Sequence, residues 1–83
     1  EGAGISILFS NPILSDITII NNIAISNIGA GILILEANPI ITNAIIDNNL
    51  GAAIYLMGGS PRLTNIKMDN NIKLYWLMQL VRD

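Results

Sequence analysis

The 83-residue sequence contains no cysteine and no histidine. Without cysteine, the chain can form neither a disulfide framework nor a thiolate metal site. Without histidine, it lacks the commonest general base and the commonest transition-metal ligand. Catalytic arrangements of the Ser-His-Asp and Cys-His types are therefore excluded.

Charged residues are also scarce, at 12% of the chain with a net charge of −2. The four basic residues are too dispersed to form the basic stripe that a phosphate backbone requires, so we predict no nucleic-acid partner. Apolar residues make up 52%, yet no apolar run approaches the roughly 18 to 20 residues of a transmembrane helix. We therefore predict a folded chain without a transmembrane span, since disordered chains are poor in aliphatic residues.

The sequence consists largely of three copies of one repeated unit. Residues 2–22, 29–49 and 51–71 align without a gap as GAGISILFSNPILSDITIINN, GAGILILEANPIITNAIIDNN and GAAIYLMGGSPRLTNIKMDNN. The only length difference falls at residues 23–28, between the first two copies. A stack of coils tolerates such an insertion because a loop can leave one corner. Because the chain starts within a copy, we also expect it to be a segment of a longer solenoid.

Apolar residues within each copy recur with period two, as where Ser6 separates Ile5 from Ile7. This alternation predicts strands with one buried face. A helix is disfavoured because every copy has a central proline, at a cost of about 3 kcal/mol. In the first copy we expect strands over residues 4–8, 13–15 and 17–20, with a turn at the Asn-Pro pair.

Positions that stay apolar in all three copies are predicted to face inward. They are Ile5, Ile7, Leu14, Ile17 and Ile19; Ile32, Ile34, Ile41, Ala44 and Ile46; and Ile54, Leu56, Leu63, Ile66 and Met68. Variable neighbours, such as Ser6, Leu33 and Tyr55 at one repeat position, are predicted to face solvent. The sequence thus predicts an all-β fold, a parallel β-helix solenoid of about three coils.

An Asn pair closes each copy, and one Asn of each pair is predicted to point into the coil from the left-handed backbone region. Stacked amides can hydrogen-bond along the axis as a ladder. We predict that the ladder consists of Asn22, Asn49 and Asn71, with Asn21, Asn48 and Asn70 as the alternative. A row of ligand-binding amides on the surface is the functional alternative.

We predict no catalytic, cofactor or metal site, and only weak candidates for surface binding. Asp47 and Asp69 share one repeat position, so stacking would bring them about 5 Å apart, where they could bind Ca²⁺ or act as a glycosidase pair. Because the first copy has Ile20 there, we interpret them as solvated surface acids.

Arg62 and Lys67 are expected on one outer face with Asp69, where they could hold an acidic sugar or serve solubility. Tyr55 is expected to face outward, where it could stack on a sugar ring, although an outward aromatic residue is more often simply a strand former.

Residues 72–83 lack both the glycine and the Asn-Pro turn of the repeat. The spacing of Leu74, Leu77, Met78 and Val81 predicts a short amphipathic helix that caps the open coil end. The alternatives are a helix that binds a partner or a membrane surface, and a tail unrelated to the fold.

The pattern GxGIxI…NPxLxN…I…NN over residues 2–71 resembles the repeats of right-handed parallel β-helix proteins in the pectin-lyase-like superfamily. The resemblance implies a structural or adhesion-type segment of a secreted or cell-surface protein, with a polysaccharide or cell-surface glycan as partner. The alternative is a carbohydrate-active module, a lyase, hydrolase or binding module, with its active residues on other coils.

Two families of enzymes in that superfamily test the alternative. Polygalacturonase-like members use aspartates with a histidine, which is absent. Pectate-lyase-like members use several Ca²⁺-binding carboxylates with a catalytic Arg or Lys, for which the only candidates are Asp47, Asp69, Arg62 and Lys67. We therefore favour a scaffold over an enzyme.

A leucine-rich repeat is the competing architecture, because residues 33–40 match part of its motif. Against it, the position of Leu33 is occupied by Ser6 and Tyr55 in the other copies, where that motif needs a buried Leu.

Overall fold

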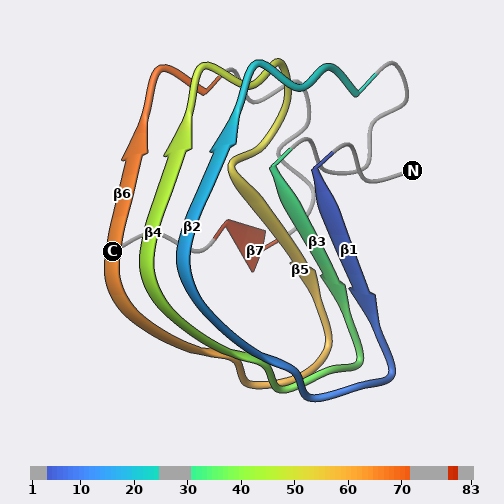
Figure 1. Cartoon of the computed structure of the whole chain (residues 1–83). Helices are drawn as coiled ribbons and strands as arrows, with labels where there is room; N and C mark the ends of the chain where they lie inside the picture. Colours follow the sequence, from blue (N-terminus) through green and yellow to red (C-terminus); the bar gives the residue numbers. More distant parts are fainter. Residues whose placement is uncertain (1–3, 25–30, 72–78, 81–83) are drawn as a thin grey trace.

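The computed structural model describes residues 4–24, 31–71 and 79–80. The strands are β1 (Ile5–Leu8), β2 (Ile13–Ile20), β3 (Ile32–Leu35), β4 (Ile40–Asp47), β5 (Ile54–Met57), β6 (Arg62–Asp69) and β7 (Gln79–Leu80). Each repeat supplies one short and one long strand, which together make one coil (Figure 1). All elements assigned in the described residues are strands, so the all-β prediction is confirmed and the leucine-rich repeat is excluded.

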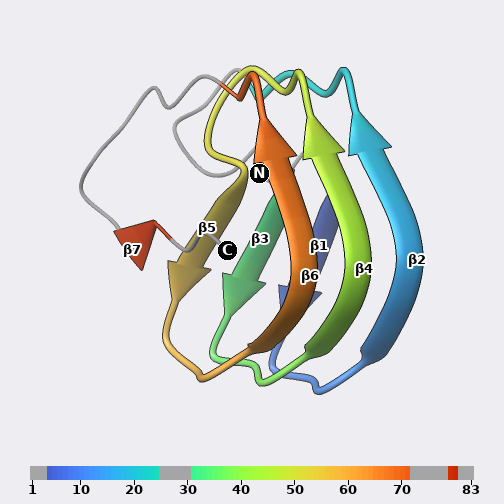
Figure 2. The same cartoon turned by 90° about the vertical axis from the view of Figure 1, so that its left-hand side faces the viewer.

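The coils stack in parallel, so equivalent residues of successive copies are neighbours. One sheet has the order β1-β3-β5-β7 and the other β2-β4-β6, and the two sheets face each other across the coil (Figures 1 and 2). Ile7 pairs with Ile34, which in turn pairs with Leu56. The repeat alignment therefore gives the strand register directly, across a separation of 27 residues at the first junction and 22 at the second.

The space between the sheets is filled by aliphatic side chains. All of the residues predicted to face inward belong to one core cluster, either buried or partly buried against it. Ala37 and Ala53 complete this cluster. Side chains of equivalent positions thus form continuous columns along the solenoid axis, as the prediction required.

Each long strand bends at one residue in the left-handed region. This residue is Asp16 in β2, Asn43 in β4 and Asn65 in β6, with φ near +57° to +59°. Only short polar residues and glycine adopt this conformation at low cost. The bend explains why Leu14 and Ile17 both face inward, since a straight strand would turn residues three apart to opposite faces.

Two further left-handed positions complete the corners of the coil. One follows the short strand and is occupied by Phe9, Glu36 and Gly58; the other is occupied by Asn21, Asn48 and Asn70. A residue with positive φ therefore turns the chain at each of three equivalent corners in every copy, and in the third copy Gly59 next to Gly58 also has positive φ.

The prediction that the repeat position of Tyr55 and Leu33 faces solvent was wrong for these two residues. They point away from the main core, yet Tyr55 is 5% and Leu33 8% exposed, and both belong to a second cluster with Ala52. The two side chains are neighbours in the register of β3 and β5, so each covers part of the other. The equivalent Ser6 is exposed, as predicted.

The tail also departs from the prediction. Gln79–Leu80 form strand β7, which pairs antiparallel with β5 through Tyr55 and Leu56, so the predicted helix does not extend over these two residues. The unpaired edge of β5 accounts for the difference, because its backbone groups can accept a strand more readily than a helix. The remainder of the predicted helix, residues 72–78 and 81–83, lies outside the described residues.

Glycine allows the coils to approach closely at one corner. A Cβ atom on Gly31 would lie 2.3 Å from the carbonyl oxygen of Ala53, and one on Gly4 would lie 2.5 Å from that of Gly31. These carbonyls accept hydrogen bonds from the amides of Ile32 and Ile5, so they cannot move away without breaking the ladder between coils.

We therefore expect Gly31→Ala to lower the free energy of unfolding by about 2 kcal/mol, within the usual cost of overpacking. Urea unfolding followed by circular dichroism measures this change. Ala53→Gly is the matched control, because a Cβ is already present at that equivalent position, and it should cost no more than about 1 kcal/mol. Equal losses in the two variants would contradict the proposed close approach.

Candidate functional site

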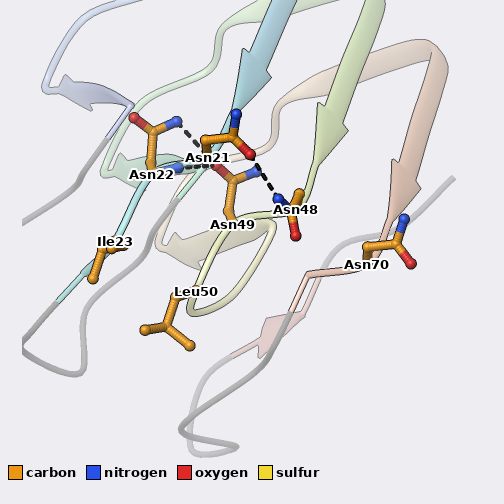
Figure 3. A pocket seen from close by; sticks show the side chains of 7 residues that line it. All are labelled: Asn21, Asn22, Ile23, Asn48, Asn49, Leu50 and Asn70. Atoms are coloured by element: carbon orange, nitrogen blue, oxygen red, sulfur yellow. Dashed lines mark hydrogen bonds between the residues drawn. The ribbon is translucent and has the colours of Figure 1, made fainter.

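The most regular polar arrangement among the described residues is the inner asparagine ladder, formed by Asn22, Asn49 and Asn71. Figure 3 shows its first two members, Asn22 and Asn49. Asn22 Nδ2 donates to Asn49 Oδ1 at 2.9 Å, and Asn49 Nδ2 donates to Asn71 Oδ1 at 2.8 Å. The backbone amides of Asn22 and Asn49 donate to the same two oxygens, at 3.0 and 3.1 Å. The ladder thus forms with the residues that the sequence predicted.

Asn49 lies in the middle of this ladder and is only 1% exposed. Its Oδ1 accepts two hydrogen bonds, and its Nδ2 donates both to Asn71 and to the carbonyl of Ile19 at 3.2 Å. The full hydrogen-bonding capacity of the amide is therefore used. A buried amide without these partners would cost about 1–3 kcal/mol per unsatisfied group.

The left-handed residue of each Asn pair is not the one that points inward. Asn21, Asn48 and Asn70 have positive φ, at +60°, +57° and +54°, whereas their successors form the inner ladder. The prediction that one residue does both was wrong. The two roles separate because the left-handed residue turns the corner, and the side chain that follows it is directed into the coil.

An open hollow of about 250 Å³ lies beside Asn21, Asn48 and Asn70, which we call the outer Asn residues (Figure 3). It is lined by Asn21, Asn22, Ile23, Asn48, Asn49, Leu50 and Asn70. Asn48 Nδ2 donates to Asn21 Oδ1, at 2.6 Å, and this leaves Asn21 Nδ2 and Asn48 Oδ1 outside the side-chain hydrogen bonds among the described residues. The hollow therefore combines free amide groups with the apolar side chains of Ile23 and Leu50.

Asp47 and Asp69 are direct neighbours in the register of β4 and β6, as their shared repeat position implied. Asp47 Oδ1 accepts a hydrogen bond from Asn70 Nδ2 at 3.0 Å. Within residues 4–24, 31–71 and 79–80, no three His, Cys, Asp or Glu residues are grouped so that they could hold a metal ion. The pair is thus a surface feature in which one carboxylate is bonded to an amide of the neighbouring coil.

The other candidates are divided between the surface and the interior. Arg62, Lys67 and Asp69 all lie exposed on β6, on the outer face where they were expected. Tyr55 is buried, so its ring is not available for stacking on a sugar. Only the charged candidates remain accessible to a ligand.

Comparison with known proteins agrees with this geometry. The family model described as a right-handed beta helix region matches residues 1–73. The chain belongs to the right-handed β-helix family. A search of the curated proteins and a search of the solved structures found no match to this β-helix. Across the described part of the chain, no helix has the length and apolar character needed to cross a membrane.

Two outer rows of hydrogen bonds in this β-helix were not predicted. Asn43 Nδ2 donates to Asp16 Oδ1 and Asn65 Nδ2 to Asn43 Oδ1, at 3.1 and 2.7 Å. In the proline turns, the amide of Asn38 donates to Asn11 Oδ1 and that of Ser60 to Asn38 Oδ1, at 2.9 and 2.7 Å. The recurrence of Asp or Asn at one repeat position was the available signal for the first row.

We expect Asn49→Ala to lower the free energy of unfolding by about 3 kcal/mol, because the groups of Asn22, Ile19 and Asn71 that it bonds would lose their partner. Denaturant unfolding followed by circular dichroism measures this loss.

The matched control is Asn48→Gly, which keeps the left-handed backbone and removes one exposed hydrogen bond. It should cost less than about 1 kcal/mol, as exposed hydrogen bonds contribute little. A loss at Asn48 as large as that at Asn49 would show that the inner ladder has no special part in stability.

Proposed function

We propose that these coils serve as a structural or adhesion-type scaffold of a secreted or cell-surface β-helix protein. The proposal is supported by the hydrogen bonds that the recurring polar side chains make between coils. The rows that contain Asn22, Asn21, Asp16 and Asn11 all hydrogen-bond one coil to the next. The polar positions that recur in the sequence therefore act in stacking the coils, which is what a scaffold requires.

The outer face of the β2-β4-β6 sheet supports a role in contact with a partner. Its strands present rows of exposed side chains at the spacing of about 4.8 Å between neighbouring strands. Ile13, Ile40 and Ile45 are among the exposed large apolar residues of this face, at 75%, 36% and 45% exposure. Exposed apolar side chains on neighbouring strands favour contact with a partner surface. The partner that we propose is a polysaccharide or cell-surface glycan, as the resemblance of the repeat pattern implies.

The proposed location is based on the sequence alone. The repeat pattern of residues 2–71 resembles those of large secreted and cell-surface bacterial β-helix proteins.

A second candidate function is carbohydrate binding in the hollow beside the outer Asn residues. It is favoured by the free Asn21 Nδ2 and Asn48 Oδ1 atoms, which could bond sugar hydroxyls, next to the apolar Ile23 and Leu50. Sites for small ligands combine apolar walls with a few polar groups in this way.

Calorimetry and ultraviolet absorbance with polygalacturonate, with and without Ca²⁺, separate these functions. A scaffold segment yields no unsaturated product under either condition, and any binding should be lost on changing Ile45 to Asp on the outer face. Formation of unsaturated product would contradict the scaffold and establish a lyase.

The control variant for the second candidate is Asn48→Gly. If binding is lost in this variant and retained in the Ile45→Asp variant, the hollow is the binding site, and the outer face is not.

A further inference from the structure

The two ends of the solenoid differ at the corner where coils approach most closely. The carbonyl of each following coil lies over a glycine, with Gly4 below Gly31 and Gly31 below Ala53. The third coil has Ala53 at the equivalent position, and its Cβ would meet the carbonyl of any fourth coil stacked in the same way. We call the surface beyond coil three the C-terminal face; at this corner it does not accept another coil.

Strand β7 also obstructs the C-terminal face. It pairs antiparallel with β5, through Leu80 with Tyr55 and Gln79 with Leu56. A fourth coil would need that edge of β5 for a parallel strand. The C-terminal face is therefore closed by a side chain and by a strand of the chain itself.

We call the opposite surface, on the outer side of coil one, the N-terminal face, and the contact between two successive coils an internal junction. The N-terminal face has the same features as one side of an internal junction, but no coil is stacked on it. In each internal junction, an Asn Oδ1 accepts bonds from the amide and Nδ2 of the preceding coil, as Asn49 Oδ1 does from Asn22. Asn22 Oδ1 is in the equivalent place and accepts no such bond among the described residues. An acceptor is therefore presented where a preceding coil would supply two donors.

The backbone and the core are open on this face as well. The amides of Ile5 and Phe9 donate to coil two, so by the alternation of a parallel ladder those of Ser6 and Leu8 are directed to the open edge of β1. Ile5 and Ile17 are only partly buried, whereas their equivalents in coil two, Ile32 and Ala44, are buried. A hollow of about 420 Å³ lies over this exposed part of the core.

We propose that the N-terminal face binds one further coil of the same repeat, stacked in parallel register ahead of residue 4. The partner must donate a hydrogen bond to Asn22 Oδ1, as Asn22 does to Asn49 Oδ1. In the row of Asp16 the later coil donates to the earlier one, but an ionised Asp16 cannot donate, so at this place the preceding coil supplies the donor. A coil like residues 29–50 meets both conditions, because Asn49 and Asn43 supply amides at these positions. The proposal is independent of any glycan binding.

A second copy of the chain is a poorer occupant. Its C-terminal face cannot stack on the N-terminal face of the first copy, because Ala53 and β7 obstruct that stacking. Two N-terminal faces could meet only with their strands antiparallel, which does not reproduce the register of the internal junctions. The geometry therefore favours a coil of this repeat over a second copy of the chain.

The test inserts a copy of residues 29–50 between Glu1 and Gly2 of the full chain. We expect the thermal midpoint to rise by about 5 °C or more, a shift that a modest stabilisation produces in a domain of this size. Hydrogen exchange at the amides of Ser6 and Leu8 should slow by at least about tenfold, since each gains a strand partner.

Two matched variants act as controls. The same segment inserted between Ile72 and Lys73 should leave the midpoint unchanged, because the C-terminal face is closed. The N-terminal insertion with Asn49→Ala in the added copy only should lose most of the gain. Equal shifts from the two insertions, or fast exchange at Ser6 and Leu8 beside an unfolded, protease-sensitive added coil, would overturn the proposal. So would concentration-dependent protection of these amides in the unaltered chain, which would identify a second copy as the occupant.

Discussion

The structure depends on one buried side-chain amide, that of Asn49, which needs hydrogen-bond partners in the coils before and after it. Asn49 is almost completely buried, and its bonds run to Asn22 and Ile19 in the coil before it and to Asn71 in the coil after it. A coil shifted by one residue would leave these groups unpaired and would also turn its aliphatic side chains outward. The ladder and the core therefore select the same register, and each coil is stable only when stacked on another.

The shape of the coil follows from where the chain can adopt positive φ. Asn and Asp occupy two of the three corners in every copy, and these residue types visit the left-handed region at low cost. The third corner is less regular, with Phe9 and Glu36 in the first two copies and Gly58 in the third. Several polar corner residues also bond to their equivalents in the next coil, as Asn43 does to Asp16 and Asn48 to Asn21, so one side chain serves both the turn and the stack.

Repetition explains how much of the structure could be predicted. Positions apolar in all three copies proved to be the core, and the aligned repeats gave the pairing of Ile7 with Ile34 and Leu56. Prediction failed where a residue acts outside the repeat. Tyr55 and Leu33 are buried although the equivalent Ser6 is exposed, and the tail contributes β7 through an edge that no repeat position describes.

The candidate site was less predictable than the fold. Repeat positions placed Asp47 beside Asp69 and identified the inner ladder, since both depend only on register. They could not show which residue of an Asn pair has positive φ, because both are Asn and the choice depends on the direction of the corner. The free amide groups of the hollow depend on side-chain hydrogen bonds, which the spacing of residues does not specify.

Nuclear Overhauser effects between methyl groups test the stacking most directly. In a chain labelled at the Ile and Leu methyl groups, contacts from Ile7 to Ile34 and from Ile34 to Leu56, without one from Ile7 to Leu56, are the expected result. Contacts that join these residues in any other order, or that connect none of them, would contradict the stacked coils.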